Sequence, residues 1–272
     1  MKRRLILLIA GMVLIVGMVF LFIAKKRAGV YLSKKPNNTA SLPLLLTQAK
    51  EAEAKASLLE AKATYQKLIS EFPGSAEILN WQKKSEDLNI KLLFSSSFTP
   101  KSLLYEIKPG DTLTKIAREF KTTQDLIKKS NGLSDDKILP GRKIKVWTAP
   151  FTILVDKSQN SLILKTDEEI IKTYIVSTGA NNSTPTGNFK IVNKLLNPAW
   201  FKAGAVVPAG SAENILGSRW LGFNLAGYGI HGTTEPQSLG RQVTQGCVRM
   251  SNTDVEELYT IVPEGTEVTV VD

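Results

Sequence analysis

The chain has 272 residues, 43% hydrophobic and 22% charged, a composition typical of a globular protein of one to three domains with an added apolar segment. Its net charge of +10 is uneven, because residues 1–150 carry 26 Lys or Arg against 13 Asp or Glu, whereas residues 151–272 carry 9 against 12. A basic first half beside a mildly acidic second half argues against nucleic-acid binding. The positive surplus suits an anionic membrane surface or a polyanionic cell wall, or it is a solvated face.

The first segment has the pattern of a membrane helix. Three basic residues are followed by twenty uncharged, almost wholly apolar residues, 5–24, and then by three more basic residues. At about 1.5 Å per residue this run spans the ~30 Å hydrocarbon core of a bilayer, and it is longer than the apolar core of a cleaved signal peptide. We therefore expect residues 1–27 to form an uncleaved transmembrane signal anchor. Basic residues on both sides leave its orientation undetermined by charge.

Residues 28–100 are predicted to form a linker and a short α-helical hairpin. Strong helix formers with apolar positions three and four apart predict one helix from Leu44 to about Ser70, and Pro73-Gly74 ends it. A second helix is expected from Ala76 to about Phe94. The first helix and its end resemble part of a tetratricopeptide repeat, which favours a spacer or a surface for a protein partner that the sequence does not identify.

Residues 101–148 alternate short strand and helix signals. A strand is expected near Tyr105 and another over residues 143–146, and two helices with caps at Thr112 and Thr123 are expected between them. The order and the residues resemble a LysM domain, a βααβ module. The resemblance implies binding to glycan strands that contain N-acetylglucosamine, or a LysM fold whose groove is no longer used.

The remaining residues, 149–272, are predicted to form a β-rich domain. Runs of β-formers predict strands, and a helix is expected near the end. The expected strands are 151–155, 161–164, 170–176, 188–192 and 267–271, and the expected helix is 253–261. Four aromatic residues in this region are expected to be core residues more often than walls of a cleft. They are Trp200, Phe201, Trp220 and Tyr228.

This domain contains the only histidine and the only cysteine of the chain, His231 and Cys247, sixteen residues apart. A single cysteine excludes an internal disulfide. A thiol needs a base to become a nucleophile near neutral pH, and imidazole suits that task. Taken alone, however, such residues are more often a buried hydrophobe and a satisfied structural group.

The residues around them decide the interpretation. His-Gly-Thr, Glu-Pro and Ser-Leu-Gly, followed by Thr-x-Gly-Cys-Val-Arg-Met, resemble the signature of the L,D-transpeptidases, cysteine enzymes of the YkuD fold. The resemblance implies that Cys247 is the nucleophile and His231 the base, held by a backbone carbonyl at Gly232. Gln245 stands where the family usually has a second histidine, and its amide donates hydrogen bonds without carrying charge.

The resemblance and the local glycine suggest further roles. Gly246 is expected to support an oxyanion, and Arg249 to pair with a substrate carboxylate or to form a structural salt bridge. Ser238 and Thr244 are candidate substrate-binding residues. No metal or cofactor is expected. A thiol paired with an imidazole is expected to have a pKa below that of a free thiol.

The implied reaction is peptidoglycan transpeptidation. A tetrapeptide stem is cut before its terminal D-alanine through a thioester on Cys247, and the acyl group passes to an amine of another stem. Two alternatives remain, a carboxypeptidase or endopeptidase that hydrolyses the stem, and a wall-binding protein with a decayed catalytic domain. We expect a bacterial envelope protein, anchored in the cytoplasmic membrane and facing the wall.

Overall fold

The computed structural model describes residues 41–167, 169–202 and 204–272 of the chain. The predicted signal anchor, residues 1–27, and the first part of the predicted linker lie outside the described residues. Within the described ranges, no helix is long and apolar enough to cross a bilayer. The chain divides into two compact units, residues 1–47 and 48–272, and of the first only the start of α2 is described.

The helix predicted over residues 44–70 is wrong, because the structure has two helices there. They are α2 (Ser41–Ala54) and α3 (Leu58–Glu71). Ala56 has a positive φ of 53°, and the amide of Ser57 donates to Ala52 O at 2.9 Å. This closing pattern ends a helix through a left-handed residue, which is normally glycine, so an alanine at this position carries no signal for the break.

The next helix, α4 (Ile78–Leu93), packs against α3 as the predicted hairpin requires. The second half of α4 also packs on the sheet of the β-rich domain, since Ile90 and Leu93 belong to the main hydrophobic core. The side-chain amide of buried Asn89 donates to Ile170 O and Ile171 O, each at 3.1 Å. The helix is therefore part of the packed body and more than a spacer.

The βααβ order expected for residues 101–148 is confirmed. Strands β1 (Ser102–Glu106) and β2 (Lys143–Trp147) pair antiparallel, and helices α5 (Leu113–Glu119) and α6 (Gln124–Ser130) lie between them in the chain. The hydroxyls of Thr112 and Thr123 accept from the amides of Lys115 and Leu126, as caps do.

This module shares buried residues with its neighbours. Lys145 is 2% exposed, and its ammonium donates to Leu92 O and, at 2.8 Å, to Ser95 O, the last carbonyls of α4 and of the turn after it. Burial lowers the pKa of Lys145 to about 8. Trp147 stacks on Phe151 with ring centroids 5.4 Å apart.

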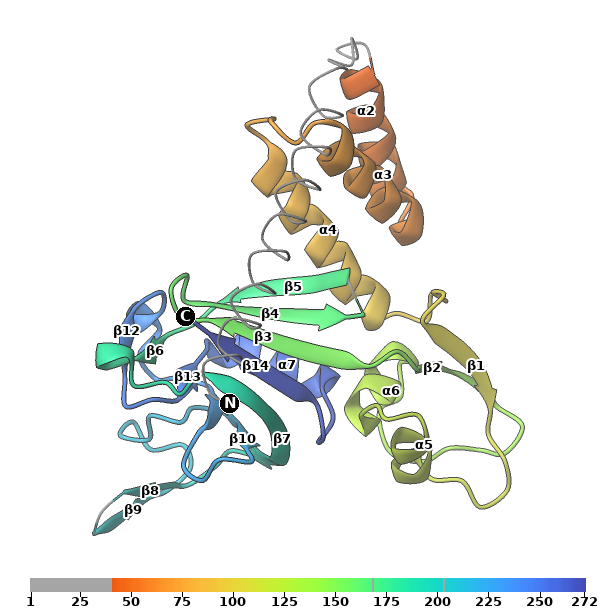
Figure 1. Ribbon diagram of the computed structural model, residues 1–272. Coiled ribbons are helices and arrows are strands. Elements are labelled where there is room, and N and C mark those ends of the chain that lie inside the picture. Colours follow the sequence, from red (N-terminus) through yellow and green to blue (C-terminus); the bar gives the residue numbers. More distant parts are fainter. Residues whose placement is uncertain (1–40, 168, 203) are drawn as a thin grey trace, which may run out of the picture. The chain divides into compact units, whose positions relative to one another are not determined.

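The β-rich domain is built on an eight-stranded sheet in the order β13-β11-β10-β7-β14-β3-β4-β5 (Figure 1). Neighbouring strands are antiparallel except in the pairs β11–β13 and β14–β3. The sheet strands are β3 (Phe151–Asp156), β4 (Ser161–Thr166), β5 (Glu169–Ile175), β7 (Gly187–Leu196), β10 (Arg219–Phe223), β11 (Gly229–His231), β13 (Val248–Arg249) and β14 (Glu267–Val271). The five strands predicted from the sequence are all present.

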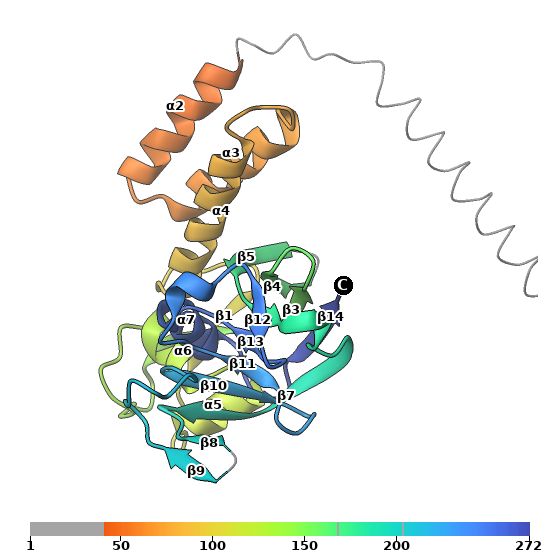
Figure 2. The ribbon, with the colours of Figure 1, turned by 90° about the vertical axis from the view of Figure 1, so that its left-hand side faces the viewer.

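Smaller elements complete the domain. The pairs β6 (Thr178–Gly179) with β12 (Gln242–Thr244) and β8 (Trp200–Lys202) with β9 (Ala205–Val207) form two short sheets, and the β8–β9 hairpin projects from the domain (Figure 2). Two 3₁₀ turns, η1 (Ala180–Asn182) and η2 (Pro236–Ser238), lie in loops. The predicted helix near the end is α7 (Asn252–Ile261), capped by the hydroxyl of Ser251.

The strands β10, β11 and β13, at one edge of the sheet, pack one of their faces into the core. Leu221, Ile230 and Val248 lie side by side on β10, β11 and β13 and are all 0% exposed. Val255 and Leu258 of α7 pack in the same core cluster. Because side chains alternate along a strand, the residues next to these three point to the opposite face, where the candidate site lies.

Candidate active site

Three neighbouring strands carry a row of site residues. Trp220 is the register partner of His231 across β10 and β11, and His231 is the partner of Arg249 across β11 and β13. Cys247 immediately precedes β13 and, two residues before Arg249, falls on the same side of the strand. The pairing therefore brings together residues that are sixteen positions apart in the chain.

His231 is held in one tautomer. Its Nδ1 lies 2.7 Å from Gly232 O, and because a carbonyl only accepts hydrogen bonds, Nδ1 carries the hydrogen. The other ring nitrogen, Nε2, therefore has the free lone pair of a base. The backbone carbonyl expected at Gly232 is confirmed as the orienting group.

The turn after His231 depends on Asn252, which the sequence analysis missed. The side-chain oxygen of Asn252 accepts from the amides of Ser218 and Thr233, at 3.0 and 3.2 Å, and its NH₂ donates to Thr233 O. A Cβ at Gly232 would lie 2.2 Å from that oxygen, so glycine is required there. No local pattern marks Asn252, because it acts across the fold from the start of α7.

The imidazole of His231 and the thiol of Cys247 are both uncharged at neutral pH. His231 is 3% exposed, and burial, aided by the positive charge of Arg249, lowers its pKa to about 4. Burial also raises the pKa of the Cys247 thiol above its ordinary value, although a backbone hydrogen bond at Gly229 and the charge of Arg249 oppose this. The expected depression of the thiol pKa is wrong, because desolvation outweighs both opposing effects.

The thiol of Cys247 donates to Gly227 O at 3.4 Å, and within the part of the chain that the structure describes it makes no hydrogen bond to His231. A thiol directed at a carbonyl is a resting arrangement, since catalytic hydrogen bonds often tighten only when substrate binds.

The turn that presents Cys247 is shaped by Thr244 and Gly246. The hydroxyl of Thr244 donates to Cys247 O at 2.7 Å and accepts from the amide of Gly246 at 3.2 Å. Gly246 has a φ of 127°, and a Cβ there would lie 2.7 Å from the ring of Tyr228. The Gly246 amide expected at the oxyanion is thus engaged by Thr244, and the hydroxyl of Thr244 serves the turn.

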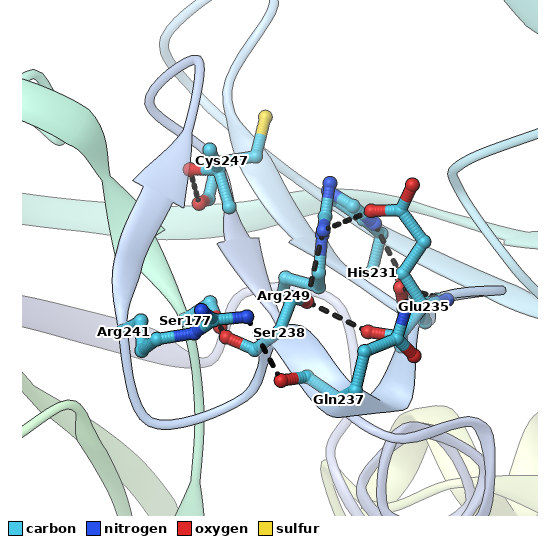
Figure 3. A network of polar contacts seen from close by, with 11 residues as sticks. Ser177, His231, Glu235, Gln237, Ser238, Arg241, Cys247 and Arg249 are labelled. Atoms are coloured by element: carbon cyan, nitrogen blue, oxygen red, sulfur yellow. Dashed lines mark hydrogen bonds and ion pairs between the residues drawn. The ribbon is translucent and has the colours of Figure 1, made fainter.

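Arg249 forms a salt bridge within the protein, which is one of the two alternatives that the sequence left open for this residue. Its Nη1 lies 2.9 Å from Glu235 Oε2 and donates to Ser238 Oγ at 3.0 Å (Figure 3). Ser238 in turn donates to Glu235 O and accepts from the hydroxyl of Ser177 through its carbonyl. Ser238 is buried against Arg249 and is not among the residues that line the cavity described next, so the structure assigns it a supporting contact to Arg249.

A cavity of about 670 Å³ opens in front of this row. Both Cys247 and His231 line it, together with Arg249, Thr244 and Gln245. All four of the aromatic residues that were expected in the core line it as well, and Phe201 on the β8–β9 hairpin is 76% exposed. The core interpretation is therefore wrong for Trp200 and Phe201, which the short hairpin holds away from the sheet, whereas Tyr228 also packs against the main hydrophobic core.

A larger cleft of about 820 Å³ lies between the helices of the βααβ module and the end of α7. It contains neither the thiol nor the imidazole, so the smaller cavity is the candidate active site. Among the described residues, no group of three or more His, Cys, Asp or Glu side chains could hold a metal ion.

Comparisons with known proteins identify two domains in the chain. The family profile of the L,D-transpeptidase catalytic domain matches residues 150–270, and that of the LysM domain matches residues 105–147. A Bacillus licheniformis protein that bears the name L,D-transpeptidase YkuD is 36% identical over 176 residues, which cover 62% of this chain and 98% of the relative. Its namesake in Bacillus subtilis is 35% identical over 175 residues, with the same coverage of both chains.

The solved structure of an L,D-transpeptidase from Mycobacterium smegmatis is 20% identical, with a TM-score of 0.40, and covers 50% of this chain and 65% of that one. The family assignment rests on the sequence relatives, which match over nearly their whole length. The chain belongs to the L,D-transpeptidase family and carries a LysM domain before its catalytic domain.

Proposed function

We propose that this chain is a peptidoglycan L,D-transpeptidase in which Cys247 is the nucleophile and His231 the general base. One observation carries the proposal. The strands β11 and β13 bring the thiol and the imidazole to one cavity, and the bond from Nδ1 to Gly232 O leaves Nε2 available as the base. Membership of the family supports the same substrate class.

The reaction begins with neutral partners. Nε2 of His231 takes the proton of the thiol as the sulfur attacks the carbonyl carbon before the terminal D-alanine of a tetrapeptide stem. The imidazolium then gives that proton to the departing amine of D-alanine, which leaves a thioester on Cys247. An amine of a second stem attacks the thioester and loses a proton to His231, and the departing thiolate of Cys247 takes that proton back, which regenerates the thiol.

Oxyanion stabilisation is assigned first to the backbone amide of Cys247. The amide of Gly246 is engaged by Thr244 in the free protein, whereas Gln245 is exposed on the cavity wall. Its side-chain amide is a neutral donor that replaces the usual second histidine of the family. The loss of one such donor lowers the rate of acyl transfer by about 10²–10³.

Arg249 is proposed to bind a carboxylate of the stem while it keeps its salt bridge to Glu235. Arg249 lines the cavity, and the bonds of its guanidinium to Glu235 and Ser238 go through Nη1. A planar guanidinium with an unused N–H suits a carboxylate. The salt bridge to Glu235 then fixes the orientation of the group that meets the substrate.

The remaining modules are proposed to place this site at the wall. The LysM domain would hold glycan strands, and residues 5–24 would anchor the chain in the cytoplasmic membrane, because twenty uncharged, almost wholly apolar residues favour a bilayer. We expect detergent, and not concentrated salt, to release the full chain from bacterial membranes. Release by salt alone would contradict the anchor.

Acylation by a carbapenem, a class of β-lactam that acylates the family, tests the catalytic assignment. We expect intact-protein mass spectra of the wild type to show one adduct, and Cys247→Ala to show none. His231→Gln should lose the adduct while its thiol still reacts with an alkylating reagent at high pH. Both variants should keep the far-ultraviolet circular dichroism of the wild type.

Incubation with tetrapeptide stems then separates the remaining functions. A cross-linked dimer in the presence of an acceptor stem is the result expected of a transpeptidase. A shortened stem with no dimer would indicate a hydrolase, and no adduct on the wild type would favour a decayed, wall-binding domain.

A further inference from the structure

The imidazole of His231 lies against an indole ring. The rings of Trp220 and His231 have centroids 6.0 Å apart and planes inclined by 17°, which is a stacked arrangement. The two residues are register partners on β10 and β11, so the strand pairing sets the contact. Nothing in the catalytic proposal above uses this ring.

The indole sits in a space that two glycines leave open. A Cβ at Gly229 would lie 2.9 Å from Trp220 Cζ2, and a Cβ at Gly222 would lie 2.7 Å from Trp220 Nε1. The same Nε1 donates to Asn193 Oδ1 at 3.1 Å. Since Gly222 and Gly229 are themselves register partners, the sheet provides a slot that fixes the indole flat against the imidazole.

The charged surroundings of His231 do not favour its protonated form. Its register partner on β13 is the positively charged Arg249, and the titratable group just before that strand is Cys247. Glu235 is paired with Arg249, α7 contributes the uncharged Asn252 next to Gly232, and Gln245 is neutral. Among the described residues, Gly232 O and the face of Trp220 are the groups that stabilise an imidazolium here.

We propose that Trp220 is a positioning residue for His231, holding the imidazole in plane and stabilising its protonated form through a cation–π interaction while the ring carries the thiol proton. The proposal rests on the proposed function in that it makes His231 the base for Cys247. The negative face of an indole is attracted to a cation within about 6 Å of its centroid, and the attraction is stronger where water is excluded.

The alternative is that Trp220 only excludes water, and the two roles predict opposite signs. If the indole stabilises the imidazolium, its removal lowers the pKa of His231, by about half to one and a half pH units. If the indole only desolvates the ring, its removal admits water and raises that pKa towards the value of a free histidine.

The single histidine of the chain makes this measurable without substrate. The imidazole ¹⁵N chemical shifts of His231 can be followed by NMR from strongly acidic to neutral pH, a range that includes its low pKa, in the wild type, Trp220→Leu and Trp220→Phe. We expect a lower pKa in Trp220→Leu and an intermediate value in Trp220→Phe, which retains a weaker π face. Trp147→Phe, which alters a stacked tryptophan outside the cavity, should leave the titration unchanged.

Acylation provides the second readout. The first-order rate constant for carbapenem acylation should fall by about 3- to 30-fold in Trp220→Leu and be partly rescued in Trp220→Phe. Asn193→Ala, which frees the indole tip, should show part of the same loss. A pKa that rises in Trp220→Leu, or equal titrations in the leucine and phenylalanine variants, would overturn the proposal even if the wild type acylates normally. If Trp220→Leu fails to fold, Trp220→Phe and Asn193→Ala provide the test: a lower pKa of His231 in these variants supports the proposal, and a higher pKa overturns it.

Discussion

At the scale of single residues, Cys247 and His231 form a neutral pair in the free protein. Burial disfavours charge on both groups, so it raises the pKa of the thiol and lowers that of the imidazole. The proton therefore stays on sulfur at neutral pH, and in the proposed mechanism it moves to Nε2 only when the thiol attacks the substrate. A thiol that stays protonated at neutral pH reacts slowly with reagents that attack the thiolate.

The pH dependence of Cys247 alkylation follows from the directions of the two pKa shifts. Because the folded-state pKa of Cys247 is raised, its thiolate forms only at alkaline pH, and the low pKa of His231 provides no imidazolium to stabilise thiolate near neutrality. We expect the rate of iodoacetamide alkylation to rise steadily with pH and to reach half its maximum above the ~8.5 of a free thiol. Glutathione under the same conditions is the control. A plateau of high reactivity between about pH 5 and 8 would show a preformed ion pair instead.

At the scale of secondary-structure elements, the end of α4 is closed by a side chain from another module. The ammonium of Lys145 on β2 donates to Leu92 O, in the last turn of α4, and to Ser95 O, in the turn that follows the helix. A cation at a helix C-terminus also interacts favourably with the helix dipole. This contact ties the LysM domain to the helical segment.

Lys145→Met is expected to lower the free energy of unfolding by about 1–3 kcal/mol, because Ser95 O loses its donor and Leu92 O keeps only the long bond from the Ser95 hydroxyl. Lys143→Met is the matched control on the same strand, where the side chain is 59% exposed and the change should stay within about 0.5 kcal/mol. Urea unfolding of the two variants measures the difference. Equal stability of the two would mean that water satisfies those carbonyls.

The sequence predicted the elements that carry local signals. Thr112 and Thr123 cap the helices expected of them, and the five predicted strands are present, because capping residues and runs of β-formers act within a few positions. The break at Ala56 was missed, since no glycine or proline marks it.

The active site was predicted in part for the same reason. The motif identified His231, Cys247 and the carbonyl of Gly232, but Asn252 and the stacking of Trp220 depend on strand register and on contacts between distant segments. The direction of the thiol pKa also depends on burial, which the motif alone does not report.

At the scale of the whole molecule, residues 48–272 form one compact unit in which the three modules share buried side chains. Leu126 of the LysM domain and Ile90 of α4 lie in the same core cluster as the strands of the catalytic domain. Thr123 also donates from its hydroxyl to Thr260 O at the end of α7. A LysM fragment of residues 101–148 would expose Leu126, Lys145 and Trp147, so glycan binding is better measured on the full chain with Cys247→Ala.

Shared burial predicts that these modules unfold together. Tryptophan fluorescence reports α4, the LysM domain and the catalytic domain through Trp81, Trp147 and Trp220, and the reactivity of the single thiol reports the active site alone. We expect both signals to change at the same urea concentration, as in a two-state transition. An earlier fluorescence change with the thiol still protected would show that the LysM domain or α4 separates first.

The parallel pairing of β11 with β13 also bears on how such an enzyme can change its preference. The alignment of thiol and imidazole comes from the register of Ile230 with Val248, and not from the length of chain that joins the two strands. The exposed loop around Gly240 and Arg241 leads to Val243 on the cavity wall. A longer or shorter loop there would alter what reaches the cavity while leaving the two reacting groups in place. Selection of the acceptor and the chemistry of acyl transfer can therefore diverge separately in this fold.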